Sequence, residues 1–180
     1  MKILGIDPGS RATGYGIIEK HGSELSFVAA GAIKTTPGAS MPVRIKQIFA
    51  GLTQVIVLEK PDTAAIEQVF MAPNPDAALK LGQARGAAIA AMTALDLDVS
   101  EYTARQIKQS AAGYGAASKE QMQHMVAKLL RYDEPLSFDA ADALACAICH
   151  AHFNHSLNKL LGTTTNTAVN ARRKKGRWRL

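Results

Sequence analysis

The stretch GIDPGSRATGYG, residues 5–16, is central to the fold because it places an acid where a buried strand turns back. The residues before the turn, 2–7, form a short apolar run that predicts a strand buried on both faces. Asp7 closes this run, and Pro8–Gly9 starts a turn, so residues 13–19 are expected to return as a second strand. A carboxylate at this position is either turn chemistry or the first member of a charged cluster.

Outward from this hairpin, the pattern predicts three strands and then alternating helices and strands. We expect strands at 2–7, 13–19, 25–33, 63–69 and 98–102, and helices from Pro42 to Lys60, from 75 to about 95, after the caps Thr103 and Ser118, and from about 137 to 160. Residues 111–117 are expected to form a flexible loop. This order predicts an α/β fold, a mixed five-stranded sheet flanked by helices.

The length and composition favour one globular domain. No stretch of about 18 apolar residues is present, so no membrane-spanning helix is expected. Asp7 comes too early for a signal peptide, and two cysteines do not make a disulfide scaffold. We therefore expect a cytoplasmic protein, with residues 1–160 as its domain and 161–180 as a polar and basic tail that is disordered.

The net charge of +6 comes entirely from the tail. Residues 172–179 hold six of the 21 lysines and arginines and no acid, so the remaining 15 cations balance the 15 acids. Such a tail attracts polyanions, nucleic acid first, or it is a solubilising end. The sequence leaves both possibilities open.

Three further acids lie at the ends of predicted elements. Glu67 lies near the end of the fourth strand, and Asp139 and Asp142 lie three residues apart in the first turns of the last helix, on one helix face. If these acids meet Asp7, they repel one another strongly unless a cation is bound. Oxygen-only ligands suit Mg²⁺ or Mn²⁺, and paired ions of this kind support displacement at phosphorus.

A stripe of small residues, Ala78, Gly82, Gly86 and Ala90, recurs every four positions in the second helix. Such a stripe allows another backbone to approach closely. It either packs on the sheet of the same chain or contacts the same helix of a second copy.

The segment Cys146–His150 matches the c-type haem attachment pattern, CxxCH. Haem attachment of this type requires export, for which the sequence has no signal. We expect core cysteines and surface histidines here, including His152 and His155, rather than a haem or zinc site.

Six short motifs, in order over residues 1–155, carry a family resemblance. They are GIDPG with TGYG, AIEQVF (65–70), LKLGQARG (79–86), YTARQIK (102–108) and DAADALA (139–145). With these motifs the sequence resembles the RuvC family of bacterial endonucleases, which resolve Holliday junctions. The first motif alone would not be specific, but the set is.

The resemblance implies a ribonuclease-H-like fold, a homodimer, and paired cleavage of opposed strands at a four-way DNA junction in recombination and DNA repair. It implies Mg²⁺ as the cofactor, two ions per active site with Mn²⁺ as a substitute, and 5′-phosphate ends. It also implies work with the RuvA–RuvB branch-migration complex. The catalytic and metal-binding acids of the family fall on Asp7, Glu67, Asp139 and Asp142.

The resemblance also places the DNA contacts. The basic positions fall on Lys108 and Lys119, and Arg105 is predicted as a further DNA contact. The base-stacking aromatic falls on Phe70, and we expect it to stack on an unpaired base, although a phenylalanine there is usually core or packs over the next helix.

Other functions remain open from the sequence. The Asp-Pro-Gly turn and Thr-Gly hairpin also resemble the first phosphate loop of sugar kinases and actin-like ATPases, which need two copies of such a fold. The same nuclease chemistry could act on an RNA–DNA hybrid or a ribosomal RNA precursor. A catalytically silent junction-binding module is the fourth possibility, and the four intact acids argue against it.

Overall fold

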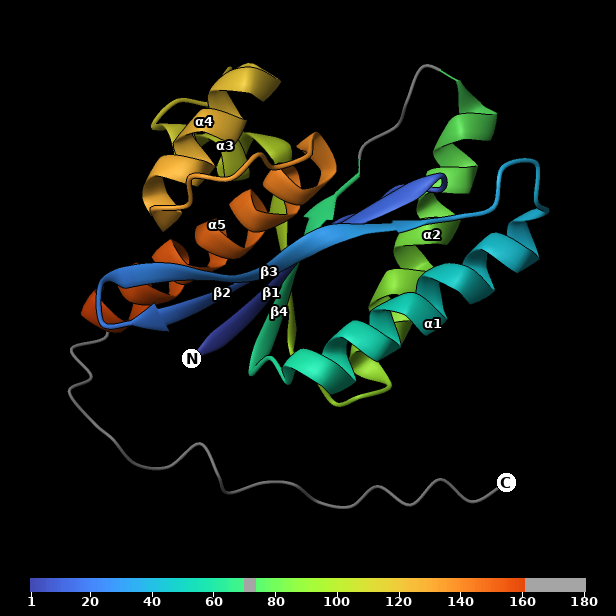
Figure 1. The fold of residues 1–180 in the computed structure, drawn as a ribbon, viewed down its shortest axis with the longest axis horizontal. Coiled ribbons are helices and arrows are strands. Elements are labelled where there is room, and N and C mark those ends of the chain that lie inside the picture. Colours follow the sequence, from blue (N-terminus) through green and yellow to red (C-terminus); the bar gives the residue numbers. More distant parts are fainter. Residues whose placement is uncertain (70–73, 161–180) are drawn as a thin grey trace.

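A computed structural model shows five strands in one mixed sheet with helices on both faces (Figure 1). The structure describes residues 1–69 and 74–160, with side chains up to residue 153, so Phe70 and the predicted tail lie outside it. The strands are β1 (Lys2–Asp7), β2 (Ala12–His21), β3 (Glu24–Lys34), β4 (Thr63–Gln68) and β5 (Val99–Thr103). The helices are α1 (Met41–Glu59), α2 (Pro75–Thr93), α3 (Ala104–Ala112), α4 (Lys119–Leu130) and α5 (Phe138–Leu160).

The sheet order is β3-β2-β1-β4-β5, so the predicted α/β class and five-stranded sheet are confirmed. β1, β2 and β3 form an antiparallel meander, and β4 and β5 extend the sheet parallel to β1. Ile6 lies opposite Ile66 in the β1–β4 pair, so Asp7 and Glu67 follow at the same level. The register therefore brings the first two predicted acids to one edge of the sheet.

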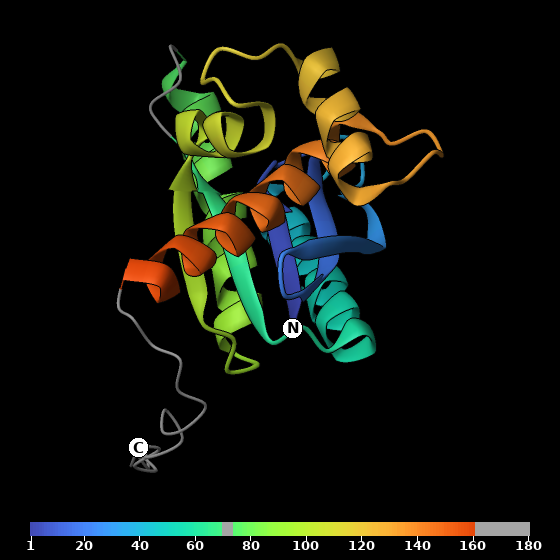
Figure 2. The ribbon, with the colours of Figure 1, turned by 90° about the vertical axis from the view of Figure 1, so that its left-hand side faces the viewer.

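Each face of the sheet has its own hydrophobic core. α3, α4 and α5 cover one face, and α1 and α2 cover the other; Figure 2 shows α5 crossing the sheet obliquely. α5 is buried on almost all sides between Ala140 and Ala151, because α3 and α4 pack against the side that turns away from the sheet. Cys146 and Cys149 lie within this buried stretch, whereas Phe153, beyond it, is 39% exposed.

Glycines in the opening hairpin allow α5 to lie directly on the strands. A Cβ added to Gly5 would lie 2.0 Å from the Ala143 carbonyl oxygen, and one added to Gly14 would lie 2.2 Å from that of Asp139. Any side chain at these positions would push α5 away from the sheet. Because Gly14 pairs with Asp7 across β1 and β2, this close approach holds Asp139 beside Asp7.

The face of α2 that carries the small-residue stripe does not pack on the sheet. Gly82 and Gly86 are exposed, and an added Cβ at either would meet nothing within 4 Å. The buried face of α2 is formed instead by Ala84, Ala88 and Met92. The sequence left open whether this stripe packs on the sheet of the same chain or contacts a second copy. The first possibility is wrong for these glycines.

By length and composition α1 could cross a membrane, which was not expected from the sequence. Its side chains Ile48, Leu52 and Ile56 are buried in the core on the sheet. Core helices of soluble proteins pass the same test, so this is weak evidence of a membrane span. The other side of α1 leaves Leu58 77% exposed.

Two local predictions were wrong. The loop predicted at 111–117 is shorter, because α3 continues to Ala112, and Ala111 and Ala117 are both buried. His150 is not on the surface but 3% exposed, with its Nδ1 2.9 Å from the Tyr102 hydroxyl and its Nε2 3.3 Å from the Thr63 hydroxyl. These two hydroxyls satisfy the ring in the interior, which is why it can be buried.

Candidate active site

Three of the four predicted acids line one pocket of about 310 Å³ at the carboxyl edge of the sheet. Asp7 comes from the end of β1, Glu67 from β4 and Asp142 from the second turn of α5. The pocket is completed by Ala104, Ile107, Lys108, Lys119 and Met122. The predicted convergence of these three acids, from distant parts of the chain, is therefore present in the fold.

Asp139 lies in the first turn of α5, one turn before Asp142, and is half-buried. It is not among the residues that line the pocket. Its charge nevertheless raises the pKa of Asp7 and of Asp142, so the fourth acid belongs to the same electrostatic cluster.

The three pocket acids are held in a state that disfavours their ionisation. Burial, and then the charges of Glu67, Asp142 and Asp139, raise the pKa of Asp7 to about 7. Burial likewise raises the pKa of Glu67, with a further contribution from Asp142. Burial also raises the pKa of Asp142. A bound cation would favour the ionised form of all three.

Two lysines oppose this effect only in part. Capping boxes at Thr103 and Ser118 start α3 and α4 as predicted, which places Lys108 and Lys119 on the rim of the pocket. The Nζ of Lys119 lies 3.9 Å from Oδ2 of Asp142, and this lysine is 67% exposed. Both lysines lower the pKa of Glu67 and Asp142, yet those pKa values remain above their ordinary range.

The donor set of the pocket fits a hard divalent ion. Its acidic oxygens come from Asp7, Glu67 and Asp142, with no cysteine or histidine among the lining residues, which suits Mg²⁺ rather than zinc. Within residues 1–69 and 74–153, no three carboxylate, cysteine or histidine side chains are close enough to form a preassembled metal-binding group. A bound cation would remove the mutual repulsion of the ionised acids.

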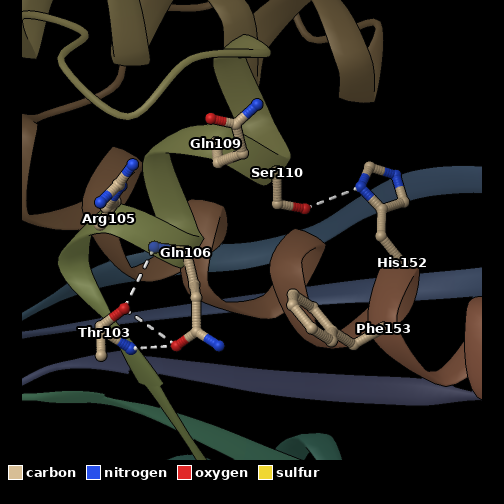
Figure 3. Close-up of a pocket in the computed structure, with 7 residues that line it drawn as sticks. All are labelled: Thr103, Arg105, Gln106, Gln109, Ser110, His152 and Phe153. Atoms are coloured by element: carbon tan, nitrogen blue, oxygen red, sulfur yellow. Dashed lines mark hydrogen bonds between the residues drawn. The ribbon is translucent and has the colours of Figure 1, made fainter.

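Arg105 lies outside this pocket, on the other side of α3. It lines a separate pocket of about 530 Å³ with Gln106, Gln109, His152 and Phe153, which Figure 3 shows between α3 and α5. Ala104, Ile107 and Lys108 face the acids, and Arg105 points away from them. As a DNA contact, Arg105 would therefore act at a distance from the cut phosphate.

The part that Gly5 and Gly14 play in the site was not predicted from the sequence. The available signal was their place inside predicted strands, where a glycine marks the close approach of another backbone.

Comparison with known proteins gives a consistent result. The family model "Crossover junction endodeoxyribonuclease RuvC" matches residues 3–150. A protein of this description from Psychrobacter sp. (strain PRwf-1) is 60% identical over 183 residues, which cover 99% of this chain and 94% of the relative. One from Acinetobacter baumannii (strain ATCC 17978) is 65% identical over 158 residues, covering 88% of this chain and 87% of the relative.

A solved structure is also similar over most of the chain. The Thermus thermophilus RuvC in complex with Holliday junction substrate superimposes with a TM-score of 0.81 at 32% identity. The match covers 87% of this chain and 96% of the other. The sequence and the fold are thus both similar to those of RuvC proteins.

Proposed function

The chain belongs to the RuvC family of crossover junction endodeoxyribonucleases, and we propose that Asp7, Glu67, Asp139 and Asp142 are the catalytic acids with which it cuts DNA. It is an endonuclease that resolves Holliday junctions in recombination and repair, with the ribonuclease-H-like fold of its family. Nucleases of this family depend on metal ions. One observation carries the assignment of the acids: residues from β1, β4 and α5 share a pocket in which burial and mutual repulsion disfavour their charge.

The proposed cofactor is Mg²⁺, two ions per active site, with Mn²⁺ as a substitute. When bound there, Mg²⁺ would supply Lewis acidity for an attacking water and for the leaving 3′ oxygen, and the products would carry 5′-phosphate ends. Asp7, which shares the pocket with the acids of β4 and α5, would help to hold the ions. Glu67 and the pair Asp139 and Asp142 would complete them, and the glycine contacts of α5 keep these carboxylates in register with Asp7.

Lys108 and Lys119 would bind the phosphates on either side of the cut. Both lie on the pocket rim, and Lys119 follows the cap of α4, where free N–H groups also favour an anion. Phe70 is proposed to stack on an unpaired junction base and Arg105 to contact an arm of the junction away from the cut.

The homodimer is proposed to form through the open face of α2. Gly82 and Gly86 would let the same helix of a second copy approach closely, and Leu79 beside them is 69% exposed. Two copies related by a twofold axis would cut two opposed strands of one junction. The RuvA–RuvB complex and a cytoplasmic location are proposed on the family resemblance.

The test uses the purified protein with Mg²⁺ and three labelled substrates: a four-way DNA junction, a linear DNA duplex and an RNA–DNA hybrid. Paired nicks confined to the junction are expected. Cutting of the hybrid instead would favour the ribonuclease alternative, and ATP hydrolysis without cutting would favour the kinase-like one. Binding of the junction without any cutting would leave only a silent binding module.

A further inference from the structure

A second cleft lies on the other side of the strand ends, between the starts of α1 and α2. In Figure 1 these helix starts lie on the face of the sheet away from α5. The cleft has a volume of about 560 Å³, within the ~300–1,000 Å³ typical of ligand sites. Its lining includes Ser10, Arg11, Ser40, Arg44, Asp76 and Lys80.

The lining is basic. Arg11, Arg44 and Lys80 bring three positive charges from three separate segments, and Asp76 is the one acid among the residues that line it. Asp76 is already paired, with its Oδ2 2.5 Å from Nζ of Lys80. None of the ion pairs in the described part of the chain involves Arg11 or Arg44. The described residues therefore leave both arginines without a paired counter-charge.

Arg44 is held in place but keeps free donors. Its Nε donates to the Ala39 carbonyl at 3.0 Å and its Nη1 to the Ser10 carbonyl at 3.5 Å, which fixes the half-buried guanidinium between the start of α1 and the turn after β1. These bonds leave other N–H groups of the guanidinium available, and carbonyls do not neutralise its charge. A positioned guanidinium with free donors suits a phosphate.

A neighbouring hollow of about 550 Å³ extends the same basic surface. It shares Arg11 and Arg44 with the first cleft and adds Lys34. In addition, Ser40 makes no side-chain cap on α1, and the first turn of α1 has no acid. This helix start therefore adds to the positive potential that the arginines create.

We propose that this cleft binds backbone phosphates of junction DNA, as a second anchoring site separate from the acid-lined pocket. The proposal rests on the function proposed above, since the polyanion is the DNA substrate of the enzyme. Arg11, which lines the cleft, follows closely after Asp7 in the chain. A DNA strand held at Arg11 and Arg44 would therefore continue toward the cut site. These residues bind phosphate and carry no sequence preference.

The experiment measures junction binding without added divalent ions, as a function of salt, for the full-length protein. Arg11→Gln, Arg44→Gln and the double variant are compared with Arg131→Gln, which removes an exposed arginine at the end of α4. Each phosphate that a variant no longer binds should lower the slope of log affinity against log salt by about one. The double variant should bind about tenfold more weakly at a fixed moderate salt concentration.

Two further arms separate charge from folding. The Arg11 side chain makes none of the hydrogen bonds described for the chain, so Arg11→Gln tests charge alone, and Arg11→Lys should restore the slope. This proposal alone would be overturned if the wild-type protein binds and cuts junctions but the double variant shows the same salt slope as Arg131→Gln. A wild-type protein that neither binds nor cuts junctions would overturn the proposed function as well.

Discussion

The two faces of the sheet carry clefts of opposite charge at the ends of the same strands. On the α5 face, Asp7, Glu67 and Asp142 share a pocket that raises their pKa values. On the α1–α2 face, Arg11 and Arg44 line a cleft whose one acid is paired with a lysine. The first cleft has an excess of acidic side chains, and the second has an excess of basic ones. The first is therefore suited to a bound cation and the second to a bound phosphate.

The faces also differ in how tightly they are packed. α5 lies on the strands with its backbone in contact with Gly5 and Gly14, whereas α2 leaves Gly82 and Gly86 open. The acids of α5 are thus held rigidly, and the open face of α2 is available to a second copy. Substitutions can test each side of this comparison separately.

The largest effect is expected when the acidic cleft loses its central charge. Asp7→Asn keeps the size of the side chain but removes a ligand charge, so junction cleavage should fall about 10³-fold or more. The measurement is single-turnover cleavage of a labelled junction with Mg²⁺. Asp133→Asn, at an exposed position outside the pocket, is the matched control and should cut normally. An Asp7→Asn protein that still cuts would show that the acids are wrongly assigned.

The packing contrast predicts opposite effects of the same substitution on stability. Gly5→Ala places a methyl group against the Ala143 carbonyl and should lower the free energy of unfolding by about 1–3 kcal/mol. Gly82→Ala has open space and should raise it by about 0.5–1 kcal/mol in the monomer, because alanine favours a helix interior. Urea unfolding measures both. Equal losses for the two variants would contradict the difference between the faces.

The raised pKa of Asp7 predicts how stability depends on pH without metal. The pKa is about 7 in the folded chain against an ordinary 3.8, so the folded state binds more protons between these values. Stability should therefore fall as pH rises from about 4 to 7 and level off above that. The melting temperature over pH 4–8 measures this, and Asp7→Asn should flatten the fall.

Magnesium should reverse this loss of stability. At pH 8 a hundredfold excess of Mg²⁺ over its Kd contributes about 2.7 kcal/mol, a rise of about 5–10 °C in melting temperature. Asp7→Asn should show a much smaller rise. An equal rise in both proteins would place the ion elsewhere.

The smallest effect is expected at the pocket rim. Lys119 lowers the pKa of Asp142 and Asp7, but it is mostly exposed, so solvent screens it. Lys119→Gln should move the rising limb of the pH profile of cleavage to higher pH by less than about one unit at saturating DNA. Lys128→Gln, on the same helix but outside the pocket, should leave the profile unmoved. If both lysine variants give the wild-type profile, Lys119 does not tune the acids.

Much of the fold could be predicted from residues that act locally. The hairpin after Asp7, the caps Thr103 and Ser118, and the spacing of Asp139 and Asp142 depend on neighbours within a few positions. The family resemblance then supplied the roles of the four acids. The loop at 111–117 was misjudged because Ala111 and Ala117 are small residues that look loop-like until a core covers them.

The order of the elements, and the acids that end them, could be read from the amino-acid order alone, because strand alternation, capping and turn chemistry are short-range effects. Folding in three dimensions was needed to show that α3 and α4 bury the outer side of α5, that His150 lies inside, and that the glycines of α2 stay open. It also brought Arg11, Arg44 and Lys80 into one cleft. These contacts join residues that are far apart in the chain. The periodic pattern of one segment does not show which of its surfaces another segment will cover.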